Sequence, residues 1–419
     1  MISQNIKINL SYIGALIICT VSGTSYLFGA YSTELADKLE FNSVEINTIG
    51  SAANYGFYLS SPFFGHIADN YGSNRTCLVS SFVIFFSYLC VALTYNGLLP
   101  SPSFLICAFY LFFMGIASAA GLICSLATVV RNLEIRSARR GIALGAPLGF
   151  YGLSSFIFSR INIWFFRGNV EHFLVFLAIV TGLGQFIGSW FLNVVLPPPS
   201  VQREEIVAVA RTTFEQATNL SSNNNCSIKN NNVNQPSERT SLLSEAVANH
   251  IALQHHEEND IGGWDLAQDN DARLLFFILF FIGGTGLMFI NNVGTIIKTL
   301  YLSVHNNHPP ISSDKQHHEL QTLQNLHVSL FSMFSCFARL SVGFLSDITK
   351  NIFNIRRLWF IAISGLTLFA GQMVAGFGVK NLDVLWIASV FIGFGCGTMF
   401  GIAPTITSEW FGAARFGSN

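Results

Sequence analysis

Charged residues are scarce in this chain of 419 residues. Asp, Glu, Lys and Arg make up only 11%, whereas about a quarter is usual for a soluble domain. Hydrophobic residues make up 51%, with 40 Phe, and the mean hydropathy is +0.48. This composition predicts a membrane protein with the lipid bilayer as its surroundings. The net charge of −1 offers no basic surface, so we expect no binding to nucleic acid.

Paired cysteines and catalytic motifs are also lacking. None of the eight cysteines forms a Cys-x-x-Cys pair, and most stand in apolar segments, as buried small side chains do. The sequence has no nucleophile elbow, metal-binding motif or phosphate-binding loop, so we expect no enzyme activity, cofactor or metal site. No cleavable signal pattern is present, so we expect the first apolar segment to remain as an anchor.

Long apolar segments, in contrast, are frequent. A helix needs about 20 apolar residues to cross a bilayer. The expected spans are 8–31, 46–68, 76–95, 104–130, 141–165, 172–196, 274–297, 325–347, 358–377 and 384–406. They predict an all-α membrane protein with an N-terminal half at 1–196 and a C-terminal half at 272–419. Prolines 197–199 are expected to end the sixth helix, and we expect polar loops at 301–324 and after residue 406.

The arginines between the fourth and fifth spans indicate the orientation. Residues 131, 136, 139 and 140 are all Arg, and such clusters stay in the cytosol. Both ends of this chain and the linker 197–271 are then expected to be cytosolic. The linker is rich in Asn, Ser, Glu and Gln, which predicts disorder over most of its length. Within it, Glu238 lies four residues before Leu242 and Leu243, a pattern that sorting adaptors bind and that also arises by chance.

A glycine-anchored motif ending in an aspartate recurs at the ends of two apolar segments. The residues concerned are Gly65, Asp69, Gly72 and Arg75 in the first copy, and Gly343 and Asp347 in the second. The motif resembles the loop signature of the major facilitator superfamily. This resemblance implies two six-helix halves around a central cavity, so ten of twelve helices are visible. It also implies that Asp69 and Arg75 close the cytosolic side, whereas the alternative is a turn without a gating role. In the second copy, Thr349-Lys350-Asn351 replaces the usual glycine and basic residues.

Further blocks resemble the nodulin-like branch of that superfamily. They are residues 23–32, 46–54, 284–294 and 408–412. Tyr151-Gly152-Leu153-Ser154-Ser155, together with the long polar linker, is most similar to the fungal MCH subgroup of monocarboxylate-transporter homologues. That resemblance implies transport of a small organic solute, and the subgroup's name suggests a carboxylate. It also implies a vacuolar membrane, with the plasma membrane as the alternative.

Arg339 is the main charge expected inside a span. A cation at that depth is costly and usually faces a cavity or a partner, so it is a candidate for binding a substrate carboxylate. Pairing with a helix carbonyl is the alternative. The other candidate cavity residues are Tyr26, Asn54, Tyr151, Asn291 and Asn292, although hydrogen bonding between helices is the commoner role for such groups.

Two classes of function remain from the sequence. The first is a secondary transporter that works by alternating access. The second is a membrane sensor that uses the same fold without transport and signals through the linker. No acidic residue lies in the middle of a span, so a coupling proton would use Glu34 or Asp37 at the end of the first span, or the two expected helices that are not visible.

Overall fold

The computed structural model describes residues 4–99, 103–136, 140–166, 169–194, 263–305, 313–378 and 382–412. Helices account for almost all of these residues, and no strand occurs among them, which confirms the all-α prediction. The chain divides into two units, and all the described residues belong to the one formed by Met1–Val194 and Gly262–Asn419. The other unit is Val195–Ile261. The end of the expected linker, 263–271, is described and mostly helical, so disorder was a wrong expectation there. The rest of the linker, including the sorting motif with Glu238, Leu242 and Leu243, lies outside the described residues.

The N-terminal half consists of long helices connected by short segments. In chain order its elements are α1 (Gln4–Ser22), η1 (Gly23–Ala30), α2 (Ser32–Leu39), α3 (Ser43–Tyr71), α4 (Ser73–Tyr95), α5 (Phe104–Arg136), α6 (Arg140–Ile161), η2 (Asn162–Phe166) and α7 (Val170–Phe191). A capping box begins α3, because Asn42 accepts from the backbone of Glu45 while Glu45 accepts from the backbone of Asn42.

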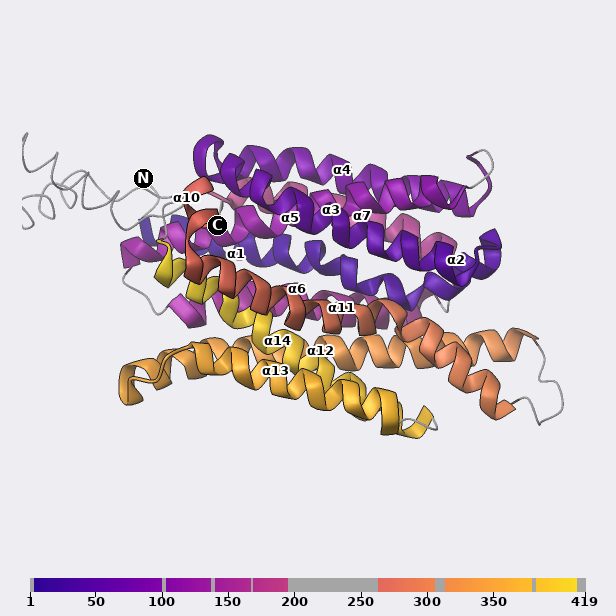
Figure 1. Cartoon of the computed structure of the whole chain (residues 1–419). Coiled ribbons are helices and arrows are strands. Elements are labelled where there is room, and N and C mark those ends of the chain that lie inside the picture. The colour runs from indigo at the N-terminus through magenta and orange to yellow at the C-terminus, as the bar shows by residue number, and fades with distance from the viewer. Residues whose placement is uncertain are drawn as a thin grey trace, which may run out of the picture. The chain divides into compact units, whose positions relative to one another are not determined.

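The C-terminal half follows the same pattern with fewer helices. Its elements are α10 (Trp264–Gln268), α11 (Asn270–His305), α12 (Ser313–Phe353), α13 (Leu358–Met373), η3 (Val374–Gly378) and α14 (Leu382–Trp410). The long helices of this unit run side by side (Figure 1).

The contacts within the two halves correspond. In the N-terminal half α5 packs on α1, α3 and α4, and in the C-terminal half α14 packs on α11, α12 and α13. The correspondence leaves α6 and α7, both of which cover α1, without counterparts among the described residues. Accordingly, 78% of the apolar membrane-spanning stretch that contains α1 is buried. The corresponding share is 28% in α11 and 28% in α13.

Nine helices in the described part are long and apolar enough to cross a membrane. The one expected span missing from these nine is 46–68, which coincides with α3. This helix does not reach the required hydropathy because it carries Asn, Ser, Gly and Tyr residues. Its packing explains this composition. A Cβ on Gly56 would lie 2.0 Å from the Phe112 carbonyl oxygen, and one on Gly115 would lie 2.0 Å from that of Ala53. Small residues thus let α3 and α5 touch along their backbones.

Three expectations about loops and helix ends were wrong. Most of 301–324 is helical, since α11 continues to His305 and α12 begins at Ser313. The segment after residue 406 is also helical as far as Trp410. The sixth spanning helix ends at Phe191, before the prolines, because Asn193 leaves the helix to pair elsewhere. Its backbone N–H donates to Ser11 Oγ (3.2 Å), and its carbonyl accepts from Asn132 Nδ2 (3.1 Å).

The first expected span is not one continuous α-helix. It changes at Gly23 into the 3₁₀ segment η1, whose residues are all buried. Gly23 permits this close packing, because a Cβ there would lie 2.0 Å from the Tyr151 carbonyl oxygen. A 3₁₀ stretch inside a helix often marks a functional hinge, and η1 carries Tyr26 toward the centre of the unit.

Candidate functional site

Helices α6 and α12 join the two halves through glycines. A Cβ on Gly141 would lie 2.5 Å from the Gly343 carbonyl oxygen, and one on Gly343 would lie 2.4 Å from that of Gly141. Gly145 and Gly149 continue the contact, against the Arg339 backbone and the Leu340 side chain. Since backbones this close leave no room for side chains, the two helices are in direct contact at the end of the unit that the sequence predicts to face the cytosol.

Pro147 interrupts the hydrogen bonding of α6 near this contact. It has no N–H, so the carbonyl of Ala143 lacks its usual helical donor. The Tyr12 hydroxyl of α1 donates to that carbonyl at 3.2 Å. The bond between α1 and α6 therefore compensates for the proline.

Asp347, from the second copy of the motif, caps the start of α6. Its carboxylate accepts from the backbone N–H of Gly141 (3.3 Å) and of Ile142 (3.1 Å), although it belongs to the other half of the chain. The first N–H groups of a helix have no partner within the helix and favour a negative charge. The sequence singled out Asp347 only as part of the motif, and the structure shows that it caps a helix of the other half.

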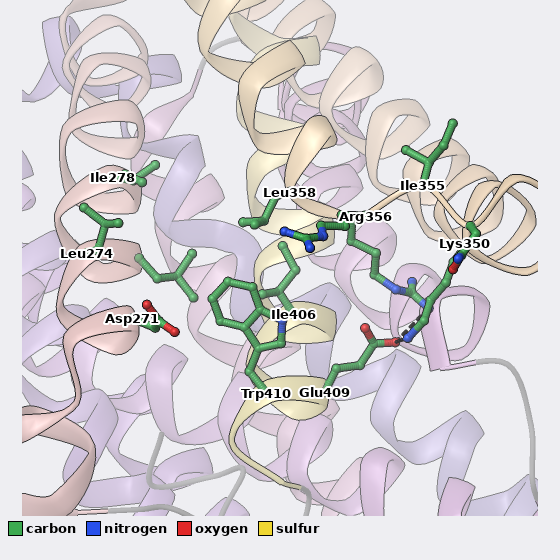
Figure 2. Close-up of a pocket in the computed structure, with 13 residues that line it drawn as sticks. Asp271, Leu274, Ile278, Lys350, Ile355, Arg356, Leu358, Ile406, Glu409 and Trp410 are labelled. Atoms are coloured by element: carbon green, nitrogen blue, oxygen red, sulfur yellow. Dashed lines mark ion pairs between the residues drawn. The ribbon is translucent and has the colours of Figure 1, made fainter.

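A cation from the next helix connection completes this cluster. Arg357 Nη2 lies 2.7 Å from Asp347 Oδ1 and 3.0 Å from Glu409 Oε1, and Lys350 Nζ lies 2.9 Å from the same Glu409 oxygen. Asp347 and Arg357 are both buried. Figure 2 shows Lys350 and Glu409 at the edge of a cavity of about 550 Å³, with Trp410 beside them. The sequence did not identify Arg357 or Glu409 as members of a site, because 62 residues separate Asp347 from Glu409 along the chain (409 − 347).

The first copy of the motif has a different geometry. Gly65 and Asp69 lie inside α3 rather than in a turn, and only Gly72 breaks the helix, with a φ of +95° that favours glycine. Arg75 is exposed in the first turn of α4. The side chain of Asp69 is outside the described residues, so the expected Asp69–Arg75 gate stays a prediction.

Arg339 lies deeper along α12 and is fully buried, at 1% exposure. Its Nη1 donates to the carbonyl oxygen of Leu148 on α6 at 2.7 Å, while its Nε has no hydrogen-bond partner. Gly152 makes this approach possible, since a Cβ there would lie 3.0 Å from Nη1. Within the described part of the chain, no carboxylate pairs with this guanidinium.

Three aromatic rings surround the guanidinium. Its carbon lies 6.0 Å from the ring centroid of Tyr26, 5.6 Å from that of Tyr151 and 5.6 Å from that of Phe400. The two tyrosine rings meet edge to face at 5.5 Å, and the Tyr151 hydroxyl lies 3.1 Å from Ser25 Oγ. The structure thus brings together Tyr26, Tyr151 and Arg339 from three different helical segments. Phe400 was missed, because a phenylalanine is not distinctive in so apolar a sequence.

The remaining cavity candidates do not join this group. No hydrogen bond or ring contact links Asn54, Asn291 or Asn292 to Arg339 within the described residues, and Asn292 donates to Met288 of its own helix at 2.9 Å. Sequence reasoning also missed His327, which is buried in α12 and lies 2.9 Å from Ser389 Oγ of α14. Its position inside an expected span was the available signal. The described residues hold no cluster of three or more His, Cys, Asp or Glu that could bind a metal ion.

Contacts at the other end of the unit are neutral or partly exposed. Lys298 Nζ lies 2.8 Å from Asp37 Oδ1, with both side chains more than a third exposed. Thr33 Oγ1 donates to Gln324 Oε1 at 2.9 Å. Asp37, a candidate for carrying a coupling proton, therefore lies in a contact between α2 of one half and α11 of the other.

Comparisons with known proteins agree with this architecture. The family model of the Major Facilitator Superfamily matches residues 13–419. An uncharacterized membrane protein of Saccharomyces cerevisiae is 26% identical, over 98% of this chain and 81% of its own length. The probable transporter MCH1 of Debaryomyces hansenii is 27% identical, over 99% of this chain and 80% of its own.

Solved structures show the same fold at low sequence identity. The proton:xylose symporter XylE, bound to 6-bromo-6-deoxy-D-glucose, has a TM-score of 0.57 at 12% identity, over 99% of this chain and 86% of its own. The human organic anion transporter MFSD10 has a TM-score of 0.54 at 13% identity, over 100% of this chain and 89% of its own. With its helices, its two related halves and this family match, the chain belongs to the Major Facilitator Superfamily.

Proposed function

We propose that this protein is a secondary transporter that moves a small organic monocarboxylate across a membrane by alternating access. The observation that carries the proposal is the buried guanidinium of Arg339, which has no carboxylate partner in the described part of the chain. Relatives named as probable transporters, and one neighbouring fold described as an organic anion transporter, support this class of function.

The chemistry of Arg339 favours an anionic ligand. A guanidinium offers five N–H donors in one plane, and a carboxylate can accept from two of them at once. One donor is used by the Leu148 carbonyl, and the unpaired Nε leaves further capacity. Ring faces attract the cation only weakly, by about 0.5–2 kcal/mol, so a carboxylate would be a stronger partner. Because Arg339 is covered in this conformation, the rings of Tyr26 or Phe400 would have to move for a solute to bind.

The Asp347 cluster is the proposed cytosolic gate. It holds the start of α6 against α12 through a buried charge, and Gly343 allows the two backbones to meet. Alternating access requires this contact to form and break. The residues Gly65, Asp69, Gly72 and Arg75 are proposed to act in the corresponding gate of the first half, from their resemblance to the family motif.

The proposal includes a location and a coupling ion. We assign the protein to the vacuolar membrane, with the plasma membrane as the alternative, and assign sorting to adaptors that bind Glu238, Leu242 and Leu243. A coupling proton would act at Glu34 or Asp37. The contact between Asp37 and Lys298 supports Asp37, because protonation would remove its negative charge and weaken a link between the halves.

The test is uptake of labelled acetate, lactate and pyruvate into vesicles that contain purified protein. Arg339→Lys keeps the charge but loses the planar pair of donors, so the KM should rise while the protein level stays normal. Arg339→Ala should abolish uptake. Arg160→Ala is the matched control, because Arg160 lies near the other end of α6, over the Phe156 ring, and should leave uptake unchanged.

Two results would contradict the proposal. A normal KM in Arg339→Ala would exclude the arginine from binding the solute. Absence of uptake by the unmodified full-length protein, for every small organic solute tried, would favour a membrane sensor on the same fold.

A further inference from the structure

The first span changes from α1 to η1 at three consecutive residues, Ser22, Gly23 and Thr24. At such a change the backbone hydrogen bonds shift from the fourth to the third residue along the chain, and their geometry becomes poorer. All three residues are buried. Since buried backbone groups need partners, other side chains have to supply the bonds that the helix loses here.

Three side chains from three other helices reach this junction. Gln185 of α7 donates from Nε2 to the hydroxyl oxygen of Ser22 at 2.9 Å. Ser155 of α6 and Tyr88 of α4 donate to the carbonyl oxygens of the next two residues, each at 3.4 Å. We call Gln185, Ser155 and Tyr88 the η1 clamp. Because their bonds go to consecutive residues, they fix the path of the chain where it leaves α1.

Gln185 is the centre of the η1 clamp and is fully buried, at 0% exposure. Its Oε1 accepts from Ser80 Oγ of α4 at 3.1 Å, and its Nε2 also donates to the Ala117 carbonyl of α5 at 3.4 Å. A Cβ on Gly121 would lie 2.7 Å from Nε2, so the glycine there leaves room for the amide. One side chain thus connects α7 with α1, α4 and α5, and a fully paired buried network of this kind makes its surroundings rigid.

Glycines of α7 bring this amide to the end of α1. A Cβ on Gly184 would lie 2.6 Å from Val21 Cγ1, and one on Gly188 would lie 2.5 Å from Ile18 Cγ1. Two glycines at this spacing let helices approach closely in a membrane. Gln185 directly follows the first of them, so the close contact between the helices sets the position of its side chain.

The geometry of the junction decides where Tyr26 points. A 3₁₀-helix turns by about 20° more per residue than an α-helix and rises by about 0.5 Å more. Tyr26 lies four residues after Ser22, so the change rotates it by about 80° and moves it by about 2 Å along the axis. In this orientation the Tyr26 ring centroid lies 6.0 Å from the guanidinium carbon of Arg339.

We propose that the η1 clamp positions Tyr26 for solute binding. Gln185, Ser155 and Tyr88 hold the first span in 3₁₀ geometry, and this geometry places the Tyr26 ring against Arg339. Among the described residues no hydrogen bond or ring contact links the three to Arg339, so they act through η1. The effect on uptake rests on the proposed transport function, whereas the effect on the order of η1 does not.

Hydrogen exchange of the purified protein in lipid nanodiscs, followed by mass spectrometry, tests the η1 clamp. Gln185→Met keeps the length of the side chain and removes the amide. Thr181→Val is the matched control, because Thr181 is also fully buried in α7, one turn before Gln185. Its hydroxyl donates at 2.7 Å to the Leu177 carbonyl of its own helix, so the control removes a buried hydrogen bond without loosening η1.

Gln185→Met should speed exchange over residues 23–30 about tenfold relative to the rest of the N-terminal half. Tyr88→Phe and Ser155→Ala should each give about fivefold, the factor that corresponds to one net hydrogen bond. Thr181→Val should leave residues 23–30 unchanged. In the uptake assay, Gln185→Met should raise the KM about fivefold and leave kcat nearly unchanged, because it weakens binding without touching Arg339.

Two results would overturn the proposal. Unchanged exchange of η1 in Gln185→Met, or equal acceleration throughout the N-terminal half, would show that the amide has only a general structural role. A loosened η1 with a normal KM would show that the junction does not position Tyr26. If Gln185→Met does not fold, Tyr88→Phe combined with Ser155→Ala decides, since each change removes only a hydroxyl group.

Failure of the transport proposal gives a different result. Absence of uptake by the unmodified protein would reject transport, while exchange over residues 23–30 would still decide whether the η1 clamp exists. Uptake that depends on Arg339 but not on Gln185 would keep the transport proposal and reject the positioning role.

Discussion

Replacing Asp347 by Asn should open the cytosolic end of the protein. Asn keeps the size of the side chain but removes its charge. The amide oxygen can still accept from one of the two N–H groups, of Gly141 or Ile142, that the carboxylate now serves. Arg357 would lose one carboxylate partner and keep Glu409 at 3.0 Å.

The size of the effect follows from these contacts. Breaking a buried ion pair by removing one partner costs about 3–5 kcal/mol, but Glu409 remains as a second acid and reduces that figure. The closed conformation, in which α6 meets α12, should then lose about 2–3 kcal/mol of stability relative to the open conformation. This corresponds to about a 30- to 150-fold change in the equilibrium between the closed and open conformations. A protein that is about 99% closed would become open and closed in roughly equal amounts.

Distances between spin labels provide the measurement. The labels are attached at Ile142→Cys on α6 and Ile352→Cys on α12, both exposed in the closed conformation. The unmodified gate should give one short distance, and Asp347→Asn should add a longer one of comparable population. Asp383→Asn is the control, because Asp383 is an exposed acid in the first turn of α14. A single short distance in correctly folded Asp347→Asn protein would refute the gating role.

Three further predictions concern the contact surface, the topology and the sorting signal. Gly141→Ala should shift the same distances toward the open state by about 1–3 kcal/mol, because its Cβ would lie 2.7 Å from Asp347 Oδ1; unchanged distances would show that the backbones adjust. Cys226 should react with an impermeant thiol reagent from the cytosolic side, and labelling from the opposite side in sealed vesicles would reject the topology. Changing Leu242 and Leu243 to Ala should move the folded protein from the vacuolar to the plasma membrane, and an unchanged vacuolar location would exclude this motif as the main signal.

The sequence alone determined the class of protein and the positions of its spans. Hydropathy is a local property, so nine of the ten expected segments appear as apolar helices in the described part of the chain. The residue types also identified Arg339 as the buried charge and Asp347 as an acid near a helix end. Each of these conclusions needs only a residue and its neighbours along the chain.

The tertiary structure decided which groups meet. Asp347 accepts from the N–H of Gly141, which lies 206 residues earlier, and Arg339 donates to the carbonyl of Leu148, which is 191 residues away. Hydropathy carries no information about such pairs, because an apolar helix can rotate about its axis without changing its sequence pattern. The rotation is fixed by contacts between helices, such as those between Gly141 and Gly343. These contacts decide that Arg339 of α12 points toward Tyr26 of η1 rather than toward the lipid.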